Sequence, residues 1–235
     1  MMKSKKQQKI IFLDNGGFSI LESLVGMLVA CLLLAAIAPI LVMSTAIRVQ
    51  ARRVEIASQA ARTFIDGVRV GSITAPEIIS QLSVATIASP RNISSSPDDY
   101  FINATEMPAP SSATGMYCYL ENGIISATSC VNNRFYIQAG RIVQTNEIND
   151  GYRLAIRVYR ADIDFTKPVK INTDSTIKQT TSTINGRLGD KQAPLIEITT
   201  DIANSSTTFQ ALCQRLGTPL VTPEPTATPT PVVCQ

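Results

Sequence analysis

The strongest pattern in the chain is an uncharged apolar stretch from Leu24 to Met43, and no later stretch is comparable. As a helix with a rise of ~1.5 Å per residue, a stretch of this length crosses the ~30 Å hydrocarbon layer of a membrane. The pattern therefore predicts one membrane-spanning helix, which we place at about residues 20–47.

An amphipathic pattern continues this helix. Charged and apolar positions alternate with the 3.6-residue period of a helix, so one stripe can face a globular head. The charged positions are Arg48, Arg52, Arg53, Glu55, Arg62 and Asp66, and the apolar ones are Ile47, Val54, Ala57, Ala61, Phe64, Ile65 and Val68. The pattern fades between Gly67 and Gly71, which predicts one long helix over residues 18–71. From Phe18 to Val70 it would measure about 80 Å before any bending.

Strand patterns dominate the later part of the chain. Gly115–Leu120 and Ile124–Ala127 flank a turn at Asn122-Gly123 and predict a hairpin. Segments 134–139 and 141–144 predict a second hairpin around Gly140. Tyr152–Arg160 shows the clearest period-2 alternation, with an apolar face that should cover the helix, and Pro194–Thr200 predicts a further strand.

The remaining segments predict irregular structure. Residues 72–110 are rich in Ser, Pro, Asn and Ala and indicate mostly loop, with a short helix near Glu77–Leu82. Thr173–Lys191 is polar and indicates an exposed insertion. Strands that follow one long helix favour an α+β fold, in which an antiparallel sheet packs on the helix. We assign residues 72–235 to this head.

Charge indicates the topology. Lys3, Lys5, Lys6 and Lys9 precede the apolar stretch, and a short basic flank favours the cytoplasmic side of a membrane. The head would then be exported through a single-pass plasma-membrane anchor. Without residues 1–17, the chain has 17 basic and 17 acidic residues. This balance gives no electrostatic footprint for nucleic-acid phosphates and argues against a nucleic-acid partner.

Three interpretations compete for residues 1–47: a cleaved secretory signal, an uncleaved anchor, and a leader peptide joined to a retained helix. The apolar stretch exceeds the ~7–15 residues of a secretory signal and lacks an Ala-x-Ala site at its end. A plain anchor does not explain Glu22, because a carboxylate inside an apolar helix costs ~2.5 kcal/mol or more. The simpler explanation of Glu22 is that it marks the membrane interface, with the span beginning at Leu24.

The string Gly16-Gly17-Phe18-Ser19-Ile20-Leu21-Glu22, between the lysines and the apolar stretch, resembles the type IV prepilin signature. The resemblance covers about residues 1–47. It implies that a prepilin peptidase removes residues 1–17 by cutting between Gly17 and Phe18, and that the same enzyme methylates the amine of Phe18. It also implies that Glu22 meets the cationic amine of Phe18 on a neighbouring subunit, so that each charge lowers the cost of burying the other.

Pro39 lies 21 residues after Phe18 and interrupts the apolar stretch. Proline removes one backbone hydrogen bond and clashes with the preceding turn, which predicts a kink or local melting. Many pilins carry a helix-disrupting proline at this distance, so its position adds to the resemblance.

Four of the five cysteines lie in the exported part, where oxidation is possible. Three pairings are open in principle. We favour closure between nearest neighbours, with Cys118–Cys130 around the first hairpin and Cys213–Cys234 around a tail rich in Pro and Thr. The alternative is that one or both pairs stay reduced.

No catalytic constellation stands out. The chain has no histidine, no glycine-rich phosphate loop, no nucleophile elbow and no cysteine cluster at metal-binding spacing. Asp162 and Asp164 lack the glycine and the distal glutamate of a calcium loop, so we interpret them as a solvated strand end. We expect a protein without enzyme activity, metal or cofactor.

The leading interpretation is a minor pilin or pseudopilin, a structural subunit of a type IV pilus-like or type II secretion-like machine. Tyr152–Ala161 and Leu195–Thr200 are similar to pseudopilins of hormogonium polysaccharide secretion, which implies a role in polysaccharide export and gliding motility. The implied partners are the prepilin peptidase, other pilins or pseudopilins, the assembly platform, membrane lipid and the exported polysaccharide. Two other interpretations are a pilus-tip subunit that binds a sugar or DNA, and a membrane-tethered enzyme.

Overall fold

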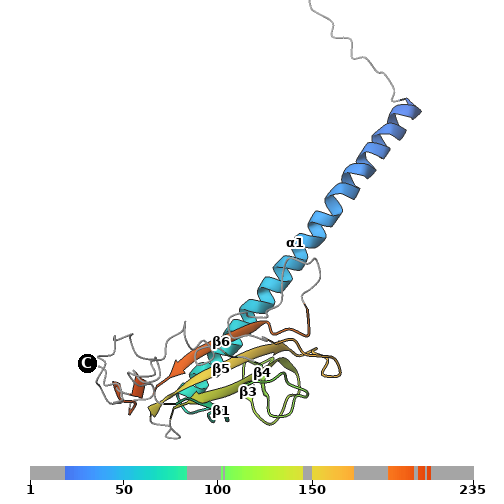
Figure 1. Cartoon of the computed structure of the whole chain (residues 1–235). Coiled ribbons are helices and arrows are strands. Elements are labelled where there is room, and N and C mark those ends of the chain that lie inside the picture. The colour runs from blue at the N-terminus through green and yellow to red at the C-terminus, as the bar shows by residue number, and fades with distance from the viewer. Residues whose placement is uncertain are drawn as a thin grey trace, which may run out of the picture. The chain divides into compact units, whose positions relative to one another are not determined.

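A computed structural model of the chain describes residues 19–83, 102, 104–144, 150–171, 190–203, 206–209 and 211–212. The predicted leader, Gly17 and Phe18 lie outside the described residues. The chain forms two compact units, Met1–Thr45 and Ala46–Gln235. Its fold is α+β, with one long N-terminal helix and an antiparallel sheet, as Figure 1 shows. This is the pilin-like layout that the sequence predicts.

The helix α1 spans Ile20–Arg69, which is 50 residues. At its C-terminal end, Gly71 has a φ of 77°, a left-handed conformation that glycine adopts without a steric penalty. The N–H groups of Gly71 and Ile73 donate to the carbonyls of Val68 and Gly67 at 3.2 and 3.0 Å. These bonds satisfy carbonyls that the last turn leaves without helical partners. The helix therefore ends inside the predicted interval.

Within the described residues, the sheet contains six strands. Five of them form an antiparallel path in the order β3-β2-β4-β5-β6, and β1 pairs in parallel with β4. The strands are β1 (Ile78–Gln81), β2 (Tyr117–Leu120), β3 (Ile125–Ser126), β4 (Asn133–Val143), β5 (Tyr152–Arg160) and β6 (Ile196–Ile202). The predicted β2–β3 hairpin and the strands β5 and β6 are confirmed.

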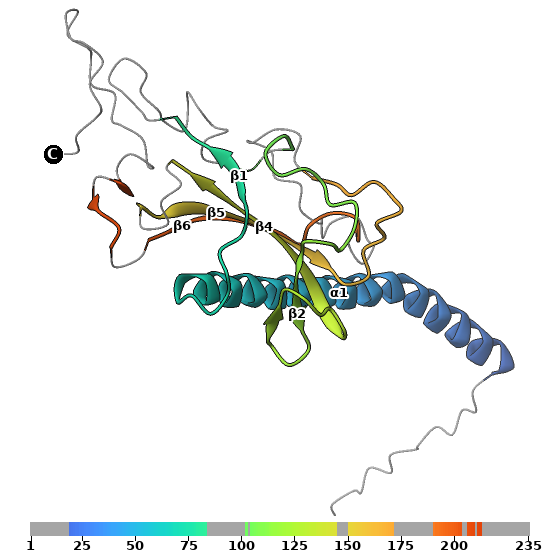
Figure 2. The ribbon, with the colours of Figure 1, turned by 90° about the horizontal axis from the view of Figure 1, so that it is seen from below.

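The core forms where the second half of α1 crosses one face of the sheet, as Figure 2 shows. Small residues on the helix, Ala57, Ala60 and Ala61, allow close approach, and Phe64 fills the space beside them with no exposed surface. Phe64 contacts Tyr117 edge to face, with ring centroids 4.8 Å apart. The sheet contributes Ile137, Leu154, Ile156 and Val158, all fully buried. The prediction that the apolar face of β5 covers the helix is confirmed.

The second predicted hairpin is wrong, because Gly140 lies inside the continuous strand β4 and not in a turn. A Cβ atom placed on Gly140 would lie only 2.5 Å from Cγ2 of Ile79. Glycine is required here because β1 passes close to β4, a common reason for glycine inside a strand.

The predicted short helix near Glu77–Leu82 is also wrong, because residues 78–81 form β1. Backbone pairing with β4 fixes this segment at both ends. The N–H of Arg141 donates to the Glu77 carbonyl at 2.9 Å, and the N–H of Leu82 donates to the Val143 carbonyl at 2.8 Å. The consecutive isoleucines Ile78 and Ile79 suit a strand, since β-branched residues pack well on a pleated surface.

Candidate functional site

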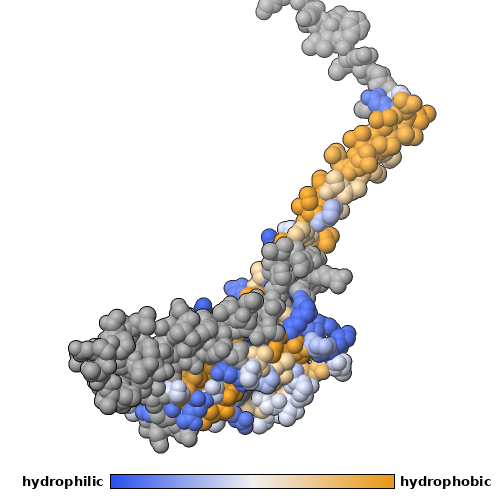
Figure 3. Space-filling model, viewed as in Figure 1, coloured by the Kyte–Doolittle hydropathy of each residue, from blue (hydrophilic) through white to orange (hydrophobic). Residues whose placement is uncertain are grey.

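The candidate assembly surface is the apolar first half of α1. Its large side chains are open to the surroundings, with exposed fractions of 75% for Met27 and 69% for Leu34, and Figure 3 shows the resulting hydrophobic surface. Within the described part of the chain, α1 is the one helix long and apolar enough to cross a membrane. Soluble proteins rarely expose a contiguous apolar area of this size, which makes this half of the helix the candidate surface for contact with lipid or with other helices.

Glu22 lies in the first turn of α1 and is exposed. It is the only charged residue between Ser19 and Ile47. The N-terminal end of a helix carries a partial positive charge, which favours a carboxylate in the first turn. This effect gives Glu22 a structural role beside the predicted assembly role. The contact with the amine of Phe18 stays a prediction, since Phe18 lies outside the described residues.

Pro39 lies within α1, and the chain is helical at every residue from Ile20 to Arg69. The local melting predicted at Pro39 is therefore not observed, because the helix continues through the proline. The predicted kink remains a prediction. Gly26 has no neighbouring atom within 4 Å of the position that a Cβ would occupy, so this face of the helix is open to close packing.

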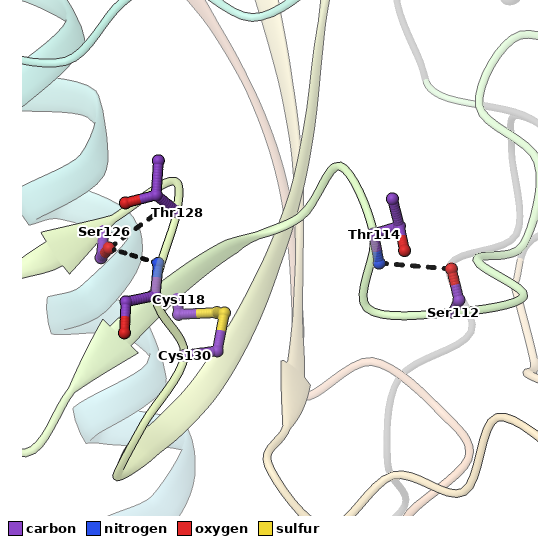
Figure 4. Close-up of a disulfide and its surroundings, with 7 residues drawn as sticks. Ser112, Thr114, Cys118, Ser126, Thr128 and Cys130 are labelled. Atoms are coloured by element: carbon purple, nitrogen blue, oxygen red, sulfur yellow. Dashed lines mark hydrogen bonds between the residues drawn. A yellow bond between two sulfur atoms is a disulfide. The ribbon is translucent and has the colours of Figure 1, made fainter.

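A disulfide fixes the first hairpin of the head. Cys118 and Cys130 are bonded, with their Cα atoms 5.4 Å apart, as Figure 4 shows. Within the loop that they close, the Ser126 hydroxyl accepts hydrogen bonds from the N–H groups of Thr128 and Ser129 at 3.3 and 3.0 Å. Cys31 is free and exposed on α1. The second predicted pair, Cys213–Cys234, lies outside the described residues.

Two adjoining hollows on the head lie between β1, β4 and the segment 106–117. Their volumes are about 280 and 310 Å³, and they share Ile79, Gly115, Met116 and Ala139 as lining residues. Glu106, Ser112 and Gln138 line the first hollow, and Glu77 lines the second. Among the described lining residues there is no lysine or arginine. Hydroxyl, amide and carboxylate groups suit a hydroxyl-rich or cationic ligand better than an anionic one.

A buried polar network positions the segment that lines the first hollow. Arg157 on β5 is fully buried and forms an ion pair with Glu197 on β6, with 2.9 Å between Nε and Oε2. The Arg157 guanidinium also donates to the carbonyl of Met107. Nearby, Nε2 of Gln138 donates to the carbonyl of Pro108 at 2.8 Å. These contacts tie residues 107–108 to β4 and β5, and Arg157 is in turn paired with Glu197 on β6.

Sequence reasoning missed this network. The alternation in Tyr152–Arg160 predicts one apolar and one polar face, whereas β5 is covered on both faces and is buried from Tyr152 to Tyr159. The signal was present in the spacing. Arg153 and Arg157 are four residues apart, as are Glu197 and Asp201, so antiparallel pairing sets the two arginines opposite the two acids. Opposite charges facing each other across strands stabilise a register.

The carboxylates after β5 have local partners. Burial opposes ionisation of Asp162, but the hydrogen bond and charge of Arg160 outweigh this effect and lower its pKa. A hydrogen bond from Thr166 lowers the pKa of Asp164, and one from Lys170 lowers the pKa of Asp190. Among the described residues, no group of three His, Cys, Asp or Glu could hold a metal ion.

Comparison of the chain with family models, curated proteins and solved structures finds no match.

The buried pair yields a stability prediction. Arg157→Met leaves the Glu197 carboxylate buried without its ion-pair partner, and we expect a loss of about 3–5 kcal/mol in unfolding free energy. Arg157→Met combined with Glu197→Leu should recover most of this loss. The matched control is Arg160→Met on the same strand, whose partner Asp162 is 57% exposed, and its loss should stay within ~1 kcal/mol.

The measurement is urea unfolding of the detergent-solubilised chain, followed by near-UV circular dichroism of its tyrosines. Equal losses for Arg157→Met and Arg160→Met would show that burial of the Arg157 pair has no energetic effect.

Proposed function

We propose that the chain is a prepilin-like minor pilin or pseudopilin, cut after Gly17 and methylated on Phe18, whose helix packs it into a membrane-anchored filament. The observation that carries the proposal is one acidic residue, Glu22, five positions after the Gly17–Phe18 bond and at the start of an exposed apolar helix. The α+β head behind that helix is compatible with the pilin-like layout.

The chemistry of Glu22 follows from its surroundings. In a filament, the apolar first half of α1 would be packed against other helices, which removes water from around the carboxylate. A buried carboxylate is tolerated when an opposite charge and hydrogen bonds compensate it. Cleavage would create such a charge, because the new amine of Phe18 is cationic and Phe18 precedes Glu22 by only four positions in the sequence. Processing would thus supply the partner that assembly requires.

A more specific part of the proposal concerns the secretion machine to which this subunit belongs. The similarity of Tyr152–Ala161 and Leu195–Thr200 to pseudopilins of polysaccharide secretion favours a role in polysaccharide export and motility. These segments contain two neighbouring strands of the sheet, β5 and β6, which pair from Tyr152↔Ile202 to Val158↔Ile196. Their likeness therefore concerns the framework of the head.

A pilus-tip subunit that binds a sugar is the second candidate, and the two hollows favour it. Their described lining offers hydroxyl, amide and carboxylate groups without a basic residue, which suits a neutral polyhydroxyl ligand. The same lining disfavours DNA, whose binding depends on neutralising phosphates.

The assembly role of Glu22 predicts the behaviour of a substitution. Glu22→Ala should leave cleavage largely intact, because the scissile bond lies five residues away. It should impair methylation of Phe18 or entry into the filament by tenfold or more, since about 1.4 kcal/mol of lost charge pairing already gives that factor. The measurement combines N-terminal mass spectrometry with immunoblotting of sheared filaments.

Glu55→Ala is the matched control, because Glu55 is an exposed acidic residue of α1 beyond the apolar part. It should assemble at the level of the unmodified chain. Normal assembly of Glu22→Ala would contradict the charge-pair role.

The sugar-binding candidate is tested by retention of the processed chain on immobilised polysaccharide and on DNA at several salt concentrations. Ser112→Trp fills the first hollow from an exposed position and should reduce polysaccharide retention at least ~fivefold, the effect of about 1 kcal/mol. Val131→Trp, at a position 71% exposed and outside both hollows, is the control. If neither ligand retains the unmodified chain, the candidate is rejected.

A further inference from the structure

Two arginines lie on one side of α1 just beyond its apolar stretch. Arg48 and Arg52 are both exposed and one helical turn apart. Gln50, between them in sequence, is 1% exposed. Residues two positions apart in a helix point about 200° away from each other. Gln50 therefore faces the interior of the head, while Arg48 and Arg52 face away from it.

Their position along the helix places them at the depth of lipid headgroups. Arg48 follows Met43, the last residue of the apolar stretch, by five positions and Arg52 by nine, about 8 and 14 Å of helix. Side chains in a helix tilt toward its N-terminus, which here means back toward the apolar stretch. Long arginine side chains place their charge at the membrane interface in this way.

The proposed cleavage would leave these arginines as the basic side chains nearest to the apolar stretch. The four lysines before the apolar stretch all lie in residues 1–17, the segment that the proposed cleavage removes. The retained chain has no basic side chain between Phe18 and Ile47. Its nearest cationic side chains to the membrane then lie on the side of the head.

We propose that Arg48 and Arg52 bind the phosphates of anionic lipids in the leaflet that faces the head. The proposal rests on the membrane anchor of the proposed function. The fork of a guanidinium matches a phosphate with two parallel hydrogen bonds, which makes arginine well suited to this contact. The complementary charges add attraction that salt weakens.

The test uses the full chain, which contains no tryptophan, so that Leu41→Trp introduces a single fluorophore. Leu41 lies in the apolar stretch and is 61% exposed. The protein is reconstituted into vesicles of phosphatidylcholine with phosphatidylglycerol, one of which carries brominated chains that quench tryptophan. Quenching is measured once with brominated phosphatidylcholine and once with brominated phosphatidylglycerol. The ratio of the two gives the relative binding of the two lipids at the helix.

We expect phosphatidylglycerol to be preferred by about fivefold for each arginine that contacts it. Arg48→Gln with Arg52→Gln should bring the preference close to one, and high salt should weaken it in the unmodified chain. The control is Arg62→Gln with Arg69→Gln, which removes the same charge from exposed positions farther along α1 and should retain the preference.

An unmodified chain without lipid preference, or a preference that survives in Arg48→Gln/Arg52→Gln, overturns the proposal. If that variant keeps the preference but fails to enter filaments, the arginines contact a neighbouring subunit and not lipid. Failure of the anchor itself is separate, because brominated phosphatidylcholine would then leave the tryptophan unquenched.

Discussion

One helix has to satisfy two different surroundings along its length, and this constraint organises the whole chain. In its first half, α1 is apolar on every side and exposes that surface. In its second half, one stripe through Ala57, Ala60, Ala61 and Phe64 is buried against the sheet, while charged residues occupy the opposite side. The change falls between Met43 and Gln50, which is also where the chain divides into its two compact units. An environment suited to one half would therefore not suit the other.

The sheet poses a second packing problem, because its strand β5 is covered on both faces. The face toward α1 is filled with aliphatic and aromatic side chains. The opposite face contains Arg157, whose charge is compensated by Glu197 and by the carbonyl of Met107. Apolar side chains on that face would need no charged partner. The Arg157–Glu197 ion pair links β5 to β6, and the bond from Arg157 to Met107 holds the segment that lines the first hollow.

Sequence reasoning recovered the features that depend on periodicity. The long helix, the strand Tyr152–Arg160 and the β2–β3 hairpin each follow from residues close together in the chain. The pairing of Cys118 with Cys130 also followed from proximity in sequence. The sequence-based prediction was wrong where contact with a distant segment determines the local structure. Glycine is common in turns, but Gly140 lies inside a strand, where the absence of a side chain leaves room for Ile79 of β1. Residues 78–81 form a strand because they pair with β4.

The features of the candidate site also differ in whether the sequence alone can predict them. The prepilin-like string is contiguous, so it can be read directly from the sequence, whereas the hollows and the Arg157 network need the sheet to be assembled first. The central claim is that proteolytic processing creates the cation that compensates Glu22. The most direct measurement is the intact mass of the protein purified from cells that contain the prepilin peptidase and from cells that lack it. If processing supplies this cation, the protein begins at Phe18 and carries one methyl group only where the peptidase is present. A chain that still begins at Met1 in both would contradict this claim.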